Sequence, residues 1–273
     1  MSASGNENGT KRQRVRALLE RYSPPVLGGI VLLLAWEYVP AFFGVSKLLL
    51  PPPSSIARSL WTIYDRGILV DNFLVTLMEA LLGFAIGAVT GIFAAFLVTR
   101  AVLIERILMP YLVGLQALPK VALAPLIVVW IGIGVESKIL ISAVISFFPV
   151  LINAIVGFTT VEAEKIDLMR SLVASRWQQF RIVIFPNSLP FIFAGLNVAI
   201  VLSITGALVG EFIGADRGLG NLLMQLNYNM DISGMFAVLV VLAGLGVLLY
   251  ALVRFLHVRL VFWGKPDNLR GSN

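Results

Sequence analysis

Three charged residues stand in or beside the long apolar stretches of this sequence and are its first candidates for chemistry. Glu37 lies between two aromatic residues, Glu79 borders the uncharged run that follows it, and Lys120 follows a proline. A charged side chain surrounded by hydrocarbon costs several kcal/mol unless it faces a partner or a water-filled cavity. Each of the three is therefore expected to make a buried polar contact or to line a polar pathway.

A structural role is favoured for the two acids, and both roles stay open for the lysine. For Glu37 we expect a structural hydrogen bond near an interface, and for Glu79 a packing partner. Lys120 stands at an expected helix break, where it could meet an anionic substrate or extend to the membrane interface. Polar residues of later runs offer hydrogen bonds but can equally join helices. The pathway candidates are Glu79, Lys120, Asn153, Ser203, Thr205 and Glu211.

Composition disfavours several kinds of site. The chain has no cysteine, which excludes disulfides, thiolate metal sites and cysteine nucleophiles. Its single histidine, His257, lies near Arg254 and Arg259 at the end of the last apolar run and is expected to be interfacial rather than a ligand. We therefore predict no catalytic set, no metal site and no cofactor bound by this chain.

The elements that position these residues are predicted to be membrane helices. Of the 273 residues, 58% are hydrophobic and 13% are charged, whereas a soluble domain is about 25% charged. The longest uncharged runs reach the length of about 20 residues that a helix needs to cross a bilayer. The net charge of +6 does not indicate nucleic acid, because the basic residues gather at the ends of apolar runs. We expect one all-α integral membrane domain surrounded by lipid.

The basic residues favour six transmembrane helices. The apolar runs are 22–46 (interrupted by Glu37), 80–99, 107–135 (broken at Lys120), 139–161, 182–210 and 234–253. With six spans, fifteen Lys and Arg fall on one side and five on the other; dividing 107–135 into two spans changes this to about nine against twelve. The positive-inside rule therefore predicts six spans with both termini in the cytoplasm. The expected parts are a cytoplasmic tail 1–21, a transmembrane domain 22–263 and a cytoplasmic tail 264–273.

Two outer segments and one glycine stripe complete the expected fold. After three prolines, residues 54–64 are expected to form a short helix along the outer surface, and residues 211–233 to pack on the outer face. Gly83, Gly87 and Gly91 repeat at every fourth position of the second span. Such a stripe lets another helix approach closely, so we interpret it as a packing surface.

The long inner loop around 162–181 has the pattern of one amphipathic helix or two short ones. Apolar residues are spaced by three and four, and the charged residues lie off that seam. Ser175 and Gln178 have the form of a capping box, which predicts a second helix from Ser175 after a bend near Val173 and Ala174. Periodicity alone leaves two alternatives open, a compact knob or a helix lying on the inner leaflet.

This loop resembles the EAA loop of binding-protein-dependent ABC permeases in the spacing of Asp167, Ala174, Ser175, Phe185-Pro186, Pro190 and Gly195. Four further stretches resemble the subfamily that imports nitrate, taurine, alkanesulfonates and thiamine-pyrimidine precursors: LPPPSSI, ALPKVALAPLIVVWIGIGVESKILI, FFPVLINAIVGF and GEFIGADRGLG. Together they cover most of residues 50–260. The resemblance implies a type I ABC importer permease fold in which 22–263 is the permease domain.

The resemblance also implies a site and partners. Residues 168–177 would form coupling helices that fit a groove on an ATPase. The ATPase-coupling set is Asp167, Leu168, Met169, Leu172, Val173, Ala174, Ser175, Trp177 and Pro186. The chain departs from the family where Val173 replaces the usual glycine and Leu168 and Met169 replace two small residues, so a bulkier knob is expected.

The function expected from this resemblance is import driven by ATP. The chain has no G-x-x-x-x-G-K-[ST] phosphate loop, so ATP and Mg would be bound by two partner ATPase subunits. A second copy of the permease and a periplasmic or lipid-anchored substrate-binding protein complete the assembly, in the bacterial cytoplasmic (inner) membrane. The expected cargo is a small organic anion or heterocycle: a sulfonate, nitrate, aromatic acid, pyrimidine or flavin precursor. An ion-coupled secondary transporter is the alternative, although only one broken span is visible where that class predicts a pair.

Overall fold

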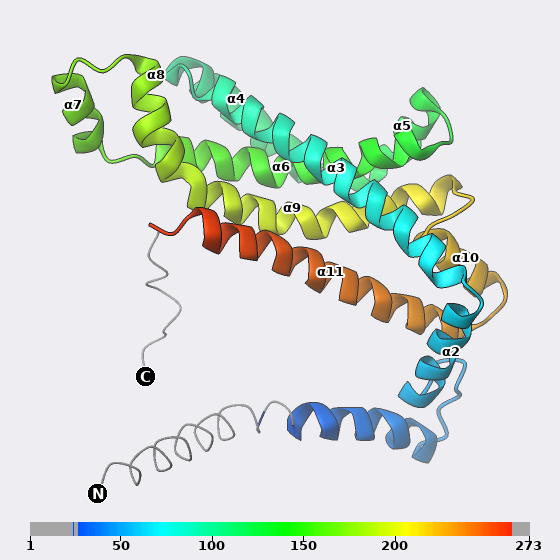
Figure 1. Cartoon of the computed structure of the whole chain (residues 1–273). Coiled ribbons are helices and arrows are strands. Elements are labelled where there is room, and N and C mark those ends of the chain that lie inside the picture. Colours follow the sequence, from blue (N-terminus) through cyan, green and yellow to red (C-terminus); the bar gives the residue numbers. More distant parts are fainter. Residues whose placement is uncertain (1–23, 25–26, 264–273) are drawn as a thin grey trace, which may run out of the picture. The chain divides into compact units, whose positions relative to one another are not determined.

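The regular elements of this chain are helices throughout the part that its computed structural model describes, which is residue 24 and residues 27–263 (Figure 1). The chain divides into two compact units. One lies within Met1–Ile63 and Leu226–Ala237, and the other within Tyr64–Gln225 and Val238–Asn273. The tails predicted for 1–21 and 264–273 lie outside the described residues.

The first unit contains a short apolar helix, Leu27–Phe42, and most of α2 (Pro53–Asp65). The Glu37 carboxylate accepts hydrogen bonds from the backbone N–H of Ser54 (3.0 Å) and from its hydroxyl (2.6 Å). These bonds satisfy a donor in the first turn of α2, where backbone N–H groups lack helical partners. The structural hydrogen bond predicted for Glu37 is therefore present, and so is the helix predicted over 54–64.

The second unit contains four long helices and several short connecting elements. In chain order they are α3 (Ile68–Val98), α4 (Val102–Ala117), the 3₁₀ turn η1 (Lys120–Leu123), α5 (Ala124–Ile131), α6 (Val135–Thr159), α7 (Ala163–Ser171), α8 (Arg176–Gln179), the π-helical turn η2 (Phe180–Ile184), α9 (Phe185–Gly214), α10 (Leu219–Tyr228) and α11 (Ile232–Leu260). Two of these helices, α10 and α11, also contribute residues to the first unit.

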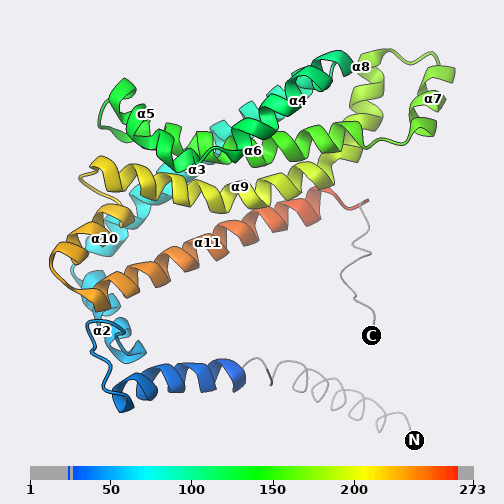
Figure 2. The same cartoon turned by 180° about the vertical axis from the view of Figure 1, so that it is seen from behind.

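The core of this unit is formed by α3, α6 and α9, which lie side by side in both views of Figures 1 and 2. The glycine stripe of α3 is a packing surface, as predicted, and the helix that it faces is α6. A β-carbon added at Gly87 would lie 2.6 Å from the carbonyl oxygen of Ala143, and one added at Gly91 would lie 3.0 Å from that of Phe147. The backbones of α3 and α6 therefore approach so closely that a β-carbon at Gly87 would force them to shift, and one at Gly91 would be crowded.

A second close contact joins α6 to α9 through small polar residues. The hydroxyl of Ser142 donates to the carbonyl oxygen of Ser203 (2.9 Å), and that of Ser146 donates to the carbonyl oxygen of Ala199 (3.3 Å). Gly206 of α9 faces Ser142 across this contact. Serines thus join two membrane helices here, and the two contacts of α6 together form what we call the small-residue seam.

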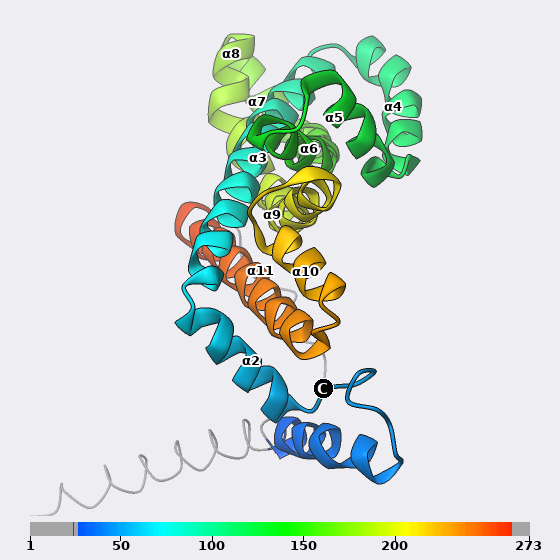
Figure 3. The ribbon, with the colours of Figure 1, turned by 90° about the vertical axis from the view of Figure 1, so that its right-hand side faces the viewer.

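The described residues account for four or five of the six predicted spans. Within the described residues, four helices are long and apolar enough to cross a membrane: α3, α6, α8–α9 taken as one, and α11. The predicted break at Lys120 is present, because 103–117 and 120–131 meet at 84° and make a fifth span only if the bent pair counts as one (Figure 3). The predicted first span is the short helix Leu27–Phe42, so a total of six stays a prediction.

Replacing Gly87 by alanine should destabilise the core by about 1–3 kcal/mol, because the new methyl group meets a backbone carbonyl that cannot move alone. The measurement is the free energy of unfolding in mixed micelles. The matched control is Gly244→Ala in α11, where an added β-carbon meets nothing within 4 Å. Equal stability of the two variants would show that α3 and α6 do not pack as described.

Candidate functional site

The loop between α6 and α9 folds into two short helices joined by a sharp turn, which we call the knob (residues 162–179). The turn is a Schellman motif, in which the N–H of Val173 donates to the carbonyl of Arg170 (2.9 Å) and that of Ala174 to the carbonyl of Met169 (3.0 Å). Val173 has φ +55°, in the left-handed region that glycine adopts freely and β-branched residues avoid. The position therefore suits the glycine that is usual in the family it resembles.

The second helix of the knob begins as the sequence predicts. Ser175 accepts a hydrogen bond from the backbone N–H of Gln178 (3.3 Å), and the Gln178 side chain accepts one from the backbone N–H of Ser175 (2.7 Å). These two bonds form a capping box. The loop therefore forms two short helices and not the single continuous helix that the sequence left open. The row of apolar residues spaced by three and four is interrupted at the turn between them.

Four large apolar residues of the knob are more than half exposed, and together we call them the knob tip. They are Leu168, Leu172, Val173 and Trp177, with exposed fractions of 62%, 68%, 91% and 60%. Two ion pairs lie within the knob: Arg170 with Asp167 at 3.0 Å and Lys165 with Glu162 at 3.1 Å. The knob thus presents exposed apolar residues beside two closed ion pairs.

A single aromatic residue fastens the knob to all three core helices. The ring of Phe180, at the start of η2, lies 4.8 Å from that of Phe96 in α3, 5.6 Å from that of Phe158 in α6 and 5.9 Å from that of Phe185 in α9. Trp177 stacks on the outer side of Phe180 at 5.7 Å. These aromatic contacts connect the start of η2, directly after the knob, to α3, α6 and α9.

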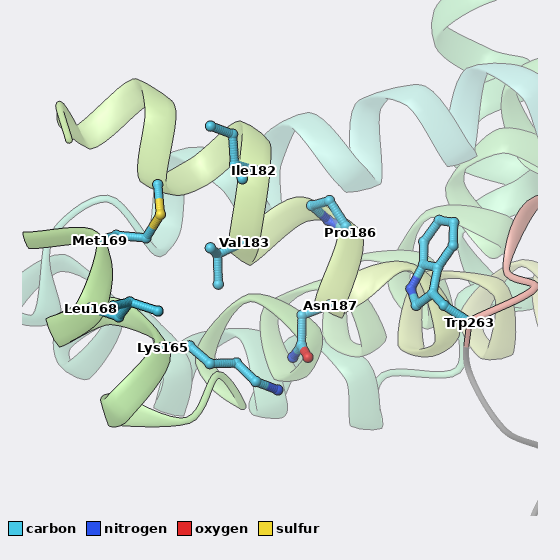
Figure 4. A pocket seen from close by; sticks show the side chains of 8 residues that line it. All are labelled: Lys165, Leu168, Met169, Ile182, Val183, Pro186, Asn187 and Trp263. Atoms are coloured by element: carbon cyan, nitrogen blue, oxygen red, sulfur yellow. The ribbon is translucent and has the colours of Figure 1, made fainter. Parts of the chain in front are cut away.

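Beneath the knob lies an open hollow of about 290 Å³ between α7 and the start of α9 (Figure 4). Leu168 and Met169 line it from α7, and Pro186 lines it from α9. Three predicted coupling residues therefore meet in one place. Its walls are mostly apolar, with Lys165 and Asn187 as the polar side chains and Trp263 at one edge.

Three of the pathway candidates are at least partly accessible. Lys120 is half-buried, donates to the carbonyl oxygen of Gln116 (2.9 Å) and lies 5.0 Å from the ring centre of Phe148. Asn153 is half-buried and donates to the carbonyl of Pro149 (2.8 Å), while Thr205 is exposed on α9. The lysine therefore supports the helix break at which it stands, because it caps a carbonyl at the end of α4.

The other three candidates, Glu79, Ser203 and Glu211, are buried. Ser203 belongs to the small-residue seam. Glu79 faces Lys138 across a gap of 3.5 Å between Oε1 and Nζ, with both side chains almost fully buried. Glu211 accepts hydrogen bonds from the hydroxyl of Thr76 (2.6 Å) and from the N–H of Gly220. We call Thr76, Glu79, Lys138 and Glu211 the buried ionic cluster.

The buried ionic cluster also holds the start of α10. Thr76 Oγ1 accepts from the N–H of Leu219 (2.8 Å), and Asn72 Oδ1 accepts from the N–H of Gly218 (2.7 Å). Side chains of α3 and α9 thereby satisfy backbone donors that a helix start leaves without partners. Sequence reasoning missed Lys138, which it counted as a loop charge, and it ended the apolar run before Glu211 although α9 continues to Gly214.

With this geometry described, comparison with known proteins identifies the family. Residues 87–261 match the family described as "Binding-protein-dependent transport system inner membrane component". The chain belongs to this family. As a permease it is the membrane component of an ABC transporter and not its catalytic subunit.

Relatives of this permease match it over nearly their whole length. It is 35% identical over 254 residues to the riboflavin transport system permease protein RibX of Chloroflexus aurantiacus, covering 92% of this chain and 94% of that protein. It is 30% identical over 243 residues to the formylaminopyrimidine transport permease protein ThiX of Halalkalibacterium halodurans, with 89% and 96% covered. It is 31% identical over 238 residues to the taurine transport system permease protein TauC of Escherichia coli, with 85% and 86% covered.

Solved structures show that the permease has the fold of ABC importer permeases. A chain of the inward-facing MetNI methionine ABC transporter superposes with a TM-score of 0.61 at 22% identity, covering 72% of this chain and 96% of that one. A chain of an amino acid ABC transporter superposes with a TM-score of 0.58 at 17% identity, covering 75% and 97%. The expected all-α type I fold is thereby confirmed.

In this permease, Lys138→Met should lower the free energy of unfolding by about 3 kcal/mol, because it leaves Glu79 buried without its cation. The double variant Glu79→Gln/Lys138→Met should recover most of that loss. Lys165→Met is the control, since its ion pair with Glu162 is exposed and contributes less than about 1 kcal/mol. Equal losses for Lys138→Met and Lys165→Met, measured by denaturant titration in mixed micelles, would refute the buried pair.

Proposed function

We propose that this chain forms the substrate pathway of an ATP-driven importer as a homodimer, and that a separate ATPase drives it by docking on the knob. The observation that carries the proposal is the knob tip, an exposed apolar surface on a short rigid element. Four large apolar side chains exposed together on a polar loop mark an interaction site. Its fastening through Phe180 gives such a partner a mechanical route to α3, α6 and α9.

A protein partner fits the knob better than a lipid surface does. Helices that lie on membranes carry an excess of Lys and Arg on the polar face. In α7 two basic residues are balanced by two acidic ones, and the pair of Asp167 and Arg170 is closed within the helix. Without an excess of positive charge, an anionic bilayer has little to attract. A groove on an ATPase would cover the apolar tip and leave the paired charges at its rim.

The proposed mechanism is a switch between two states of the helix bundle. Closure of two ATPase subunits around ATP and Mg would draw the knobs of two permease copies together. The movement would pass through Phe180, Pro186 and Pro190 into α9 and open the bundle outward, and hydrolysis would reset it. The differential contact that such a switch needs is the one between the knob and the ATPase in its two forms.

The proposed assembly lies in the bacterial cytoplasmic membrane with both termini in the cytoplasm. A periplasmic or lipid-anchored binding protein would deliver the cargo to the outer side. Lys120, Asn153 and Thr205 are proposed to line the pathway, since they are the candidates that the fold leaves accessible. A small organic anion or heterocycle is the proposed cargo, in keeping with the riboflavin, formylaminopyrimidine and taurine transport named for the relatives.

The variant Ala174→Glu should abolish association with the ATPase while membrane insertion and the melting temperature stay unchanged. Ala174 sits in the turn beside the tip, so a longer acidic side chain would hold the two surfaces apart and bring a charge to an apolar contact. The measurement is size exclusion of the permease with the ATPase that co-purifies with the unaltered chain and carries the phosphate loop.

Ala57→Glu on the exposed face of α2 is the matched control, because it adds the same group on the segment predicted to lie outside. An intact complex with Ala174→Glu would remove the knob from the coupling role.

A further inference from the structure

Val173 occupies a backbone conformation that its side chain disfavours. Within the described residues, only Val173 and Met230 are non-glycine residues with positive φ, at +55° and +54°. At this point of a Schellman motif glycine adopts the left-handed conformation without steric conflict, whereas a side chain branched at the β-carbon crowds the backbone. The valine is therefore the less stable choice for the turn itself.

Contacts with the described residues of the chain do not compensate for this strain. The Val173 side chain is 91% exposed, the largest exposed fraction among the large apolar residues of the described part. Neither burial nor dispersion contacts with its own fold can stabilise it there. Any stabilising contact of the isopropyl group must therefore be made with a surface outside the described residues, because within them the group only destabilises the turn.

The surroundings of Val173 indicate the chemistry of that outside surface. Leu172 precedes it, and Leu168 and Trp177 are the other large apolar residues of the knob that are more than half exposed. The nearest charged pair, Arg170 with Asp167, is already closed at 3.0 Å. The complementary surface is therefore a small apolar pocket rather than a charged or hydrogen-bonding one.

We infer that Val173 is a specificity residue of the knob: its isopropyl group inserts into an apolar pocket on the partner ATPase and helps this permease to select that ATPase. This inference rests on the proposed docking of the ATPase and adds to it the residue and the pocket that discriminate. An ATPase shaped for glycine at this point has no room for the two methyl groups. An ATPase with the pocket loses apolar contact when the two methyl groups are absent. Each ATPase therefore binds best to the permease whose residue at position 173 fits it.

Two variants separate contact from strain. Val173→Gly relieves the backbone and removes the side chain, whereas Val173→Thr keeps the branched shape and the strain but replaces a methyl group by a hydroxyl. If the side chain is buried in an apolar pocket, we expect the dissociation constant of the ATPase to rise about tenfold for Val173→Gly and several-fold for Val173→Thr. Strain alone would predict tighter binding for Val173→Gly and no change for Val173→Thr.

The experiment titrates the co-purifying ATPase against full-length permease in lipid nanodiscs. Met230→Gly, which removes a left-handed apolar residue from the segment predicted to lie outside, should leave the dissociation constant unchanged. Unchanged or tighter binding of both Val173 variants would overturn the inference, including the case in which lipid rather than ATPase covers the tip. In that case Ala174→Glu separates the two proposals. If the ATPase still binds the Ala174→Glu variant, the docking proposal is wrong; if the ATPase no longer binds it, only the role of Val173 is wrong.

Discussion

The close approach of α6 to α3 on one side and to α9 on the other is the constraint on which the rest of this structure depends. In a bilayer, lipid tails are as apolar as helix side chains, so helices associate through close packing and a few hydrogen bonds rather than through exclusion of water. Glycines of α3 and serines of α6 permit that packing. Larger residues along the small-residue seam would separate the helices and remove most of what holds them.

The buried ionic cluster and the knob lie at opposite ends of this three-helix core. Lys138 of the buried ionic cluster lies near the first residue of α6, and Phe158 in the contact below the knob lies near its last. The cluster secures the start of α10 at one end, and Phe180 secures the knob at the other. A tightly packed core has few ways to deform, so in the proposed mechanism force applied at the knob would be transmitted along the helices rather than absorbed between them.

Much of this arrangement could be predicted from local patterns, because those patterns act over one or two helical turns. The glycine stripe, the cap formed by Ser175 and the break at Lys120 are of this kind. The partners of Glu79 and Glu211 could not be predicted, since Lys138 and Thr76 reach them through contacts between distant segments. The left-handed backbone of Val173 could not be predicted from the sequence, because a β-branched residue rarely adopts it; only the Schellman turn that ends α7 requires it there. Whether the knob binds an ATPase is not a property of this chain alone, and it stays a prediction.

The most direct test of the central claim is a cross-link from the edge of the knob tip. The chain contains no cysteine, so S171C would carry the only thiol and could be labelled with a photoreactive maleimide. In membranes that contain the whole transporter, the account predicts an adduct with the ATPase from position 171 and none from M230C. Equal labelling from the two positions, or active transport with no ATPase adduct at position 171, would contradict it.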